Sequence, residues 1–181
     1  MDTNFLLIRK MKQGDDAALE LFVHRYYDDI LKYCRYHCAD NAFAEDLAQE
    51  TFVHFFEKLS VYHYRGRTKN YLYTIAGNLC RDFYKKVKEV PIDKMPETEE
   101  NQTNQILNKI IVENALKELP DELREVIILY YFQELKISEI ANILNIGLPL
   151  TKYRLKRGRT LLEHLMRKED LYEDRRTVND L

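Results

Sequence analysis

Aromatic and cationic side chains alternate in one short stretch of the chain, from Tyr62 to Asn70. Aromatic rings provide planes on which unpaired bases stack, and lysine or arginine beside them can pair with the phosphate backbone. This combination is typical of a surface that binds single-stranded nucleic acid. The candidate residues in this stretch and in the helix expected after it are Tyr62, His63, Tyr64, Arg65, Arg67, Lys69, Asn70, Asn78, Arg81, Tyr84 and Lys85.

A second group of cations recurs at helical spacing after Ser138. A short helix that Ser138 can cap, a turn containing Gly147 and Pro149, and a longer basic helix follow in that order. This is the layout of a helix-turn-helix, whose second helix enters the major groove of DNA. A basic helix face alone is more often solvated than bound, and the preceding helix and turn favour DNA contact. The candidate residues for duplex DNA are Lys152, Tyr153, Arg154, Lys156, Arg157 and Arg159.

The charges are segregated along the chain, although the formal net charge is only −2. Seven basic residues stand against one acidic residue in Arg65–Lys88, and the same ratio recurs in Lys152–Lys168. Between these blocks, Lys88–Gln105 holds five acids and two bases. The slightly negative net charge argues against nucleic-acid binding, but two basic blocks separated by an acidic stretch are stronger evidence in favour of it.

The cysteines and histidines offer a different chemistry, that of a metal or redox site in a metalloenzyme or sensor. No standard zinc spacing is present, and the three cysteines fit no disulfide framework. We therefore expect buried thiols, no metal and no cofactor. No nucleophile–base arrangement or phosphate-binding glycine loop is evident, so we expect no enzymatic activity. A metal or redox site would draw on Cys34, His37, Cys38, His24 and His54.

The elements that must position these groups are predicted to be helices. Glycine and proline are few, and apolar residues recur at the period of a helix. Asp15 or Asp16 can cap the helix that starts near Ala17. The predicted apolar stripes of the first half are Phe22, Tyr26, Ile30, Tyr33 and His37; Leu47, Thr51, Phe55 and Leu59; and Tyr71, Ile75, Leu79 and Phe83.

The helical pattern stops in the acidic stretch, where Pro91 and Pro96 prevent a continuous helix. The chain is thus expected to be all-α, with two small helical domains joined by a flexible acidic linker. The last long helix is expected to run from about Leu150 to Arg167, followed by an acidic tail that we expect to be disordered. The predicted boundaries are 1–88 for the first domain, 89–106 for the linker, 107–168 for the second domain and 169–181 for the tail.

No apolar run is long enough to span a membrane, and the basic residues near the start follow the apolar stretch, the reverse of a signal peptide. The sequence therefore predicts a cytoplasmic protein without membrane insertion.

Several motifs, in order, resemble the sigma-70 family of RNA polymerase sigma factors. The stretch Asp46–Phe52 is similar to the polymerase-binding signature of sigma domain 2, and Tyr71–Lys86 resembles the segment that reads the −10 element. Leu116–Val126 and Ile140–Arg159 resemble sigma domain 4, which reads the −35 element. The short length and the missing domain between them are similar to the extracytoplasmic-function group.

The resemblance implies a non-catalytic subunit that directs core RNA polymerase to promoters. Domain 2 would dock on the clamp helices of the largest polymerase subunit and hold the −10 strand, and domain 4 would sit on the flap of the second large subunit. Members of the family are usually held inactive by an anti-sigma factor. They act with polymerase on the nucleoid, in the cytoplasm. The implied polymerase-binding residues are Asp46, Gln49, Glu50 and Val53.

Some positions depart from the family pattern. Gly77 stands where an arginine is usual, and Gly158 replaces the usual alanine. The alternative is a stand-alone helix-turn-helix regulator that binds DNA without polymerase, with the first half as a sensor or dimerisation module. The Asp46–Phe52 motif argues against that alternative.

Overall fold

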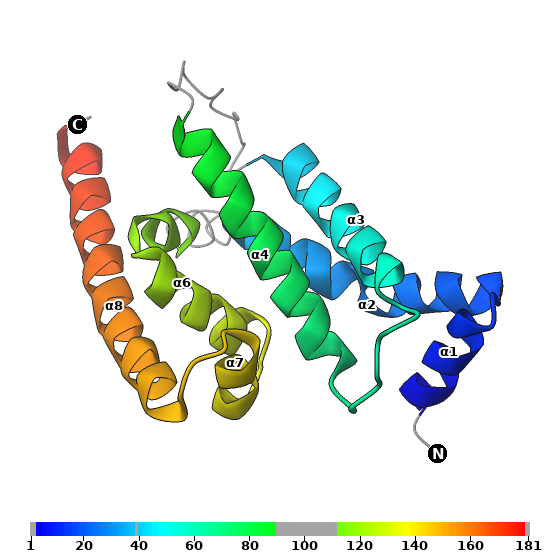
Figure 1. Ribbon diagram of the computed structural model, residues 1–181. Coiled ribbons are helices and arrows are strands. Elements are labelled where there is room, and N and C mark those ends of the chain that lie inside the picture. Colours follow the sequence, from blue (N-terminus) through cyan, green and yellow to red (C-terminus); the bar gives the residue numbers. More distant parts are fainter. Residues whose placement is uncertain (1–2, 39, 90–111, 180–181) are drawn as a thin grey trace. The chain divides into compact units, whose positions relative to one another are not determined.

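The computed structural model describes residues 3–38, 40–89 and 112–179, and all described regular elements are helices (Figure 1). Side chains are described except at 84, 86–89 and 168–179. Residues 112–118 form an additional helical segment. The other elements are α1 (Thr3–Lys12), α2 (Asp16–His37), α3 (Asn41–Glu57), α4 (Thr68–Glu89), α6 (Asp121–Ile127), η1 (Ile128–Phe132), α7 (Ile137–Ile143) and α8 (Leu148–Asn179). The expected all-α fold is confirmed for the described chain.

The chain divides into two compact units. The first contains α1 to α4, and the second contains residues 112–141 and 146–179. The predicted linker, 89–106, lies outside the described residues after Glu89. The exact domain boundaries remain a prediction, while the division into two helical units agrees with the sequence analysis.

The first unit is a bundle in which α2, α3 and α4 pack against one another and α1 packs on α2. The rings of Phe22 and Phe55 stack at 4.7 Å between centroids, joining α2 to α3. Tyr33 of α2 meets Tyr73 of α4 at 5.3 Å. Each of these four rings is at most 1% exposed. Aromatic burial of this extent is the main term that holds such a bundle together.

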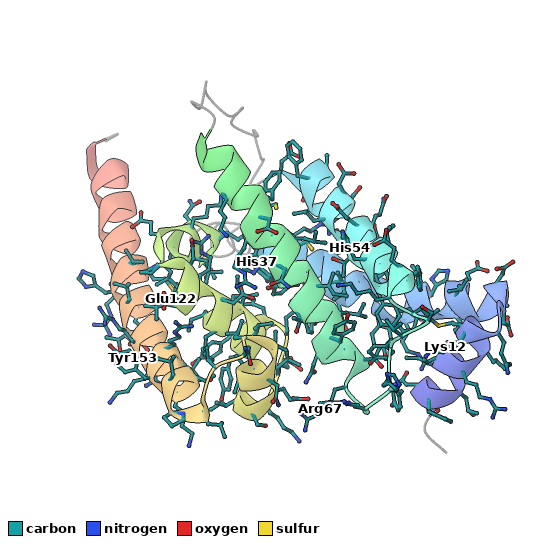
Figure 2. The ribbon with its side chains drawn as sticks, viewed as in Figure 1. Lys12, His37, His54, Arg67, Glu122 and Tyr153 are labelled. Carbon is teal, nitrogen blue, oxygen red and sulfur yellow. The ribbon has the colours of Figure 1, made fainter. Side chains whose placement is uncertain are left out.

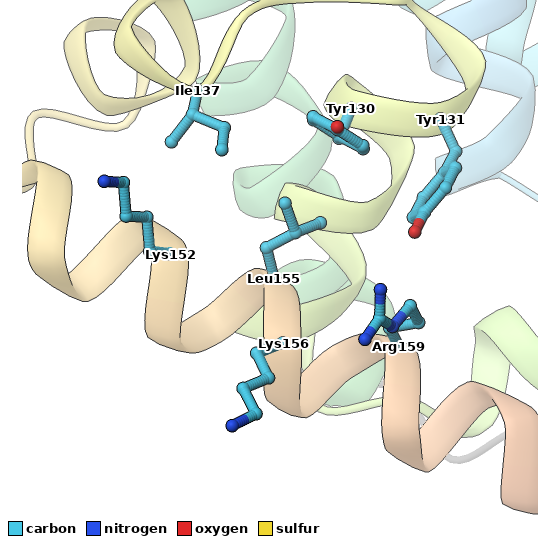
Figure 3. Close-up of a pocket in the computed structure, with 7 residues that line it drawn as sticks. All are labelled: Tyr130, Tyr131, Ile137, Lys152, Leu155, Lys156 and Arg159. Atoms are coloured by element: carbon cyan, nitrogen blue, oxygen red, sulfur yellow. The ribbon is translucent and has the colours of Figure 1, made fainter.

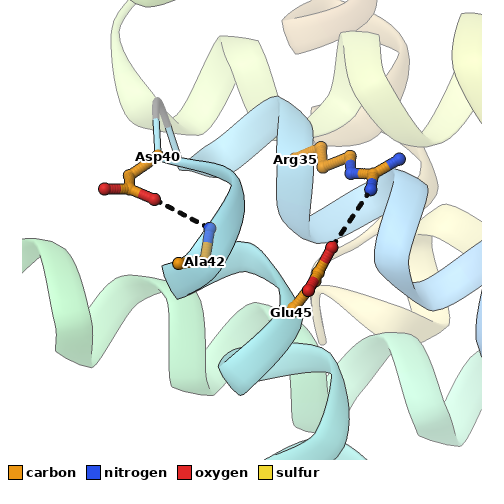
Figure 4. A network of polar contacts seen from close by, with 4 residues as sticks. All are labelled: Arg35, Asp40, Ala42 and Glu45. Atoms are coloured by element: carbon orange, nitrogen blue, oxygen red, sulfur yellow. Dashed lines mark hydrogen bonds and ion pairs between the residues drawn. The ribbon is translucent and has the colours of Figure 1, made fainter.

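The starts of α2 and α3 are fixed by aspartate caps. Asp15 accepts the Ala18 amide at 3.0 Å, which decides between the two predicted cap residues. Asp40 accepts the Ala42 amide at 2.7 Å (Figure 4). In the same view, Arg35 of α2 pairs with Glu45 of α3 at 3.4 Å. These contacts set where α3 begins relative to α2.

The predicted buried face of α4 is wrong. Ile75 and Leu79 are only half-buried. The fully buried residues are Leu72, Tyr73, Ala76 and Cys80, at most 1% exposed. Apolar side chains surround this part of α4 on several faces, so helical periodicity alone does not select the face that packs on α2 and α3.

In the second unit, α6 packs along α8. The approach is closest at Gly158, where an added Cβ would lie 2.9 Å from Cγ1 of the fully buried Ile127. Arg124 is 7% exposed and donates to the Leu119 carbonyl at 3.1 Å. The two helices are therefore closely packed at Gly158, and the buried Arg124 guanidinium holds the start of α6.

Helix α8 is longer at both ends than predicted. It begins at Leu148, which places Pro149 in the first helical turn instead of in the preceding turn. It continues to Asn179, so the expected disordered tail is wrong for its backbone through that residue. No glycine or proline follows Gly158, and leucine, glutamate and arginine are frequent there, which explains the extension.

Candidate nucleic-acid and polymerase interfaces

One face of α3 is exposed and polar. Asp46, Gln49, Glu50 and Val53 are all exposed, and Val53 is 54% exposed. The opposite face buries Leu47, Ala48, Thr51, Phe52 and Phe55 in the first unit. Helical spacing thus brings the four predicted polymerase-binding residues together on one surface, as expected.

Two further residues join this face. His54 lies with Nε2 3.6 Å from Glu50 and Nδ1 3.6 Å from Glu57 (Figure 2). From the sequence, His54 was predicted only as a possible metal ligand, and Glu57 was not among the predicted site residues. The spacing 50, 54 and 57 on one helix was the signal that could have found them.

The loop between α3 and α4 is anchored at both ends and exposed in its middle. The Tyr62 ring stacks on Tyr71 at 5.2 Å and meets Phe55 at 5.3 Å. Gly66 adopts φ +71°, which most other residues avoid. The exposed predicted residues of this loop are His63, Arg65 and Arg67.

Two predicted nucleic-acid residues of this region are held within the bundle. Lys69 pairs with Asp29 of α2 at 2.6 Å, and its ammonium lies 5.8 Å from the centroid of the Tyr73 ring. Asn70 is 8% exposed. Among the described residues, its Nδ2 has no hydrogen-bond partner. Lys69 and Asn70 were predicted to contact nucleic acid, but neither side chain is fully exposed to it.

Further along α4, Asn78 and Arg81 form one exposed polar unit. Arg81 donates to the Asn78 side chain and, through Nε, to the Gly77 carbonyl at 3.1 Å. Lys85 lies 3.8 Å from Asp82. The side chain of Tyr84, another predicted contact, lies outside the described side chains.

The predicted helix-turn-helix is formed by α7 and α8. Helix α7 begins at Ile137, so Ser138 lies inside the first turn and not at the predicted cap. Glu139 instead accepts the Lys136 amide at 3.0 Å. At the start of α8, the Gly147 carbonyl accepts both the amide and the hydroxyl of Thr151, at 3.0 and 3.1 Å.

Of the six predicted DNA-contacting residues of α8, Arg154 is held by another helix and the other five are exposed. Arg154 pairs with Glu122 of α6, and its side chain is 19% exposed. Tyr153 is 54% exposed, and its hydroxyl accepts a hydrogen bond from Arg157 at 2.7 Å (Figure 2). The exposed members of the set are Lys152, Tyr153, Lys156, Arg157 and Arg159.

A pocket of about 290 Å³ lies beside this basic face (Figure 3). Tyr130 and Tyr131 of η1 lie across from Leu155 in this view, and their rings meet edge to face at 4.9 Å. The helical pattern of the sequence placed Tyr130 in an apolar stripe with Leu123, Val126 and Ile127, and neither tyrosine was predicted as a site residue. The pocket is lined by Tyr130, Tyr131, Ile137, Lys152, Leu155, Lys156 and Arg159.

The cysteine region is built as a buried part of the bundle. Cys34 and Cys38 are free and buried. Burial, with smaller effects of Cys34 and Asp40, raises the pKa of Cys38 to about 12, so its reactive thiolate is disfavoured near neutral pH. Over the described ranges, no three His, Cys, Asp or Glu side chains converge as a metal site. Nor does any helix there have the length and apolarity needed to cross a bilayer.

Comparison with known proteins matches both halves of the chain to one family. The model of sigma-70 region 2 matches residues 22–89, and that of sigma-70 region 4 matches residues 109–162. The ECF RNA polymerase sigma factor SigW of Bacillus subtilis is 31% identical over 179 residues, covering 88% of this chain and 95% of SigW. If the chain were a stand-alone regulator with an unrelated first half, residues 22–89 would not be expected to match sigma-70 region 2.

Two solved structures have the same fold. CnrH, solved in complex with the cytosolic domain of CnrY, gives a TM-score of 0.75 at 22% identity over 92% of this chain and 99% of CnrH. The sigma factor RpoE of Bartonella quintana, solved with the anti-sigma factor NepR, gives 0.64 at 21% identity over 82% of this chain and 96% of RpoE. The chain therefore belongs to the extracytoplasmic-function group of the sigma-70 family, alternative sigma factors that direct transcription initiation by RNA polymerase.

Proposed function

We propose that this sigma factor joins core RNA polymerase to promoters through three separate surfaces, each formed by residues named above. The observation that carries the proposal is that sigma-70 region 2 and region 4 both match, in order, and each matched segment contains an exposed basic surface. The chemistry of RNA synthesis remains with the polymerase, and the protein itself acts as a binding subunit without enzymatic activity. Its place of action is the cytoplasm, with polymerase on the nucleoid.

The α3 face formed by Asp46, Gln49, Glu50 and Val53 docks on the clamp helices of the largest polymerase subunit. Its exposed acids, an amide and one exposed aliphatic group suit a partner surface of complementary charge. His54 and Glu57 border this face, and Glu57 adds one further exposed acid to it.

The α3–α4 loop and the exposed side of α4 hold the non-template strand of the −10 element. His63, Arg65 and Arg67 supply exposed contacts, and Asn78 with Arg81 extends the surface along α4. Unstacking a base costs a few kcal/mol. Stacking on aromatic side chains, about 1–3 kcal/mol per base, offsets that cost.

Domain 4 sits on the flap of the second large subunit and places α8 in the −35 major groove. The exposed Lys152, Tyr153, Lys156 and Arg157 are the base and phosphate contacts, while Arg154 holds the helix through Glu122. Because both domains attach to one polymerase, two modest DNA sites act together through effective concentration. The domain boundaries that we propose are 1–88 and 107–168, with residues 89–106 as linker.

An anti-sigma factor is the remaining partner. RpoE was solved with an anti-sigma factor, and the chain shares its fold. We extend this to the present protein as part of the same proposal.

Run-off transcription with core polymerase tests the proposal. Wild-type protein should give defined start sites that core polymerase alone does not give. Asp46→Ala with Gln49→Ala should abolish them and weaken core binding, whereas Glu20→Ala, an exposed acid of α2, should leave both unchanged. Lys152→Ala with Arg157→Ala should reduce transcription from −35-dependent promoters, and Arg167→Ala, farther along α8, should not.

Failure of wild-type protein to bind core polymerase, together with tight specific binding of the free protein to duplex DNA, would refute the proposal. That outcome would favour the stand-alone regulator.

A further inference from the structure

The first helix holds the loop that precedes α4. Lys12 ends α1, and its ammonium donates to the carbonyls of Ser60 and Tyr62 at 3.1 and 2.7 Å. These acceptors lie 48 and 50 residues away in the sequence. An ammonium group has three donors and no acceptor, so two backbone carbonyls are suitable partners for it. The contact joins the end of one helix to the backbone just before the exposed part of the loop (Figure 2).

A second contact comes from the same side of α1. Phe5 stands seven residues before Lys12, two helical turns away, and therefore shares its face. Its ring lies 5.9 Å from that of Tyr64 in the loop. The helix itself is held to the bundle by the buried side chains of Leu7, Ile8 and Met11. A fixed helix thus contacts the loop at two points.

These two contacts enclose His63, the first exposed candidate in the loop. On one side, the Tyr62 amide donates to the Leu59 carbonyl at 3.2 Å while the Tyr62 carbonyl accepts from Lys12. On the other side, Tyr64 lies against Phe5. With both sides held, the direction in which residues 63–67 leave the bundle depends on α1. A loop already held in its binding geometry loses less entropy when it binds.

We propose that Lys12 is a positioning residue for promoter discrimination: by holding the carbonyls of Ser60 and Tyr62, it orients His63–Arg67 toward the DNA strand. The inference rests on the proposed function in one respect, that this loop holds the −10 strand. Lys12 itself does not contact a base. Its loss therefore changes the ratio between good and poor −10 sequences, and not only the total output.

The anchoring can be tested without polymerase. Lys12→Gln removes the ammonium, and Lys10→Gln removes the same charge from an exposed position of the same helix. Amide hydrogen exchange of the free protein should become several-fold faster at Tyr62 and its loop neighbours in Lys12→Gln and remain unchanged in Lys10→Gln. Equal exchange in all three proteins would overturn the anchoring.

The functional consequence is measured on promoters that share one −35 element and vary in the −10 element. Lys12→Gln should lower the transcription ratio between the best sequence and its single-base variants several-fold, with core binding unchanged. Lys12→Arg should restore most of the ratio because guanidinium can donate to the same carbonyls. An equal decrease on every sequence would overturn the proposal, since that is the behaviour of a phosphate contact or of a reduced folded fraction.

A second variant tests whether the effect of Lys12→Gln comes from misfolding of the protein. Phe5 is 40% exposed, so Phe5→Leu keeps apolar bulk on α1 and removes only the ring contact with Tyr64. Like Lys12→Gln, Phe5→Leu should lower the transcription ratio between the best −10 sequence and its single-base variants. If Phe5→Leu and Lys12→Gln both keep the wild-type ratio, the loop is not positioned by α1. Failure of the proposed function is distinguishable, because wild-type protein would then give no promoter-specific transcript at all.

Discussion

The guanidinium of Arg154 in α8 pairs with the carboxylate of Glu122 in α6. Arg154 was predicted from the sequence to contact DNA, and its side chain is 19% exposed, compared with 57% for Arg159 on the same helix. The pair therefore holds α8 against α6, and under the proposed function the DNA contacts come from the more exposed cations of α8.

Breaking this pair is expected to destabilise the second unit. Glu122→Ala should lower the free energy of unfolding by about 1 kcal/mol, because Arg154 loses its partner while partly buried. A double-mutant cycle of Glu122→Ala and Arg154→Ala, followed by urea denaturation, should give a coupling energy larger than that of the exposed Arg159–Glu163 pair. Equal coupling energies for the two pairs would show that Arg154 is not a structural tether.

A second prediction concerns the close approach at Gly158. Alanine is favoured over glycine in a helix by about 1 kcal/mol. The added Cβ would, however, lie 2.9 Å from Ile127 Cγ1 in a fully buried environment, and overpacking costs about 1–3 kcal/mol. Gly158→Ala should therefore lower the thermal midpoint.

Removal of the opposing side chain tests the cause. Ile127→Ala opens a cavity and destabilises by itself, but in that background Gly158→Ala should become neutral or stabilising. A Gly158→Ala effect of the same size in both backgrounds would exclude a steric cause.

Cys38 provides a prediction about pH. Its folded-state pKa is raised by burial to about 12, above the ordinary value of 9.0. A raised pKa means that folding favours the neutral thiol, so this contribution to stability is fully present below about pH 9 and is lost as pH rises toward 12. Cys38→Ser should flatten the decline of stability in that window.

Alkylation of native protein at pH 8 offers a direct measurement. Cys38 should react far more slowly than in denaturant, because both burial and the raised pKa suppress the thiolate. Rapid labelling in the native state would contradict the structure of this region.

Lys156 carries a prediction about salt. It is exposed on the outer side of α8, where a phosphate contact would release a counterion from DNA. Lys156→Ala should reduce the slope of log affinity against log salt by about 1 for the polymerase complex on promoter DNA. Arg167→Ala should leave the slope unchanged, and an unaltered slope for Lys156→Ala would remove this residue from the phosphate contacts.

Local pattern was sufficient for most of the secondary structure and for the exposed face of α3. Asp15 caps α2 because a short acceptor precedes an apolar helical repeat. Asp46, Gln49, Glu50 and Val53 share a surface because the helical period places them opposite Leu47 and Phe52. These features depend on interactions within a few residues, and the printed sequence contains them.

Only the tertiary structure decided which face of α4 is buried and which cations are free. Apolar residues surround α4, so Leu72 and Tyr73 are selected over Ile75 only by the shape of α2 and α3. Lys69 pairs with Asp29, Arg154 pairs with Glu122, and Lys12 donates to the Tyr62 carbonyl. The partners in these contacts are 32 to 50 residues apart in the sequence. Such pairings depend on how helices distant in sequence pack together, and a helical period carries no information about them.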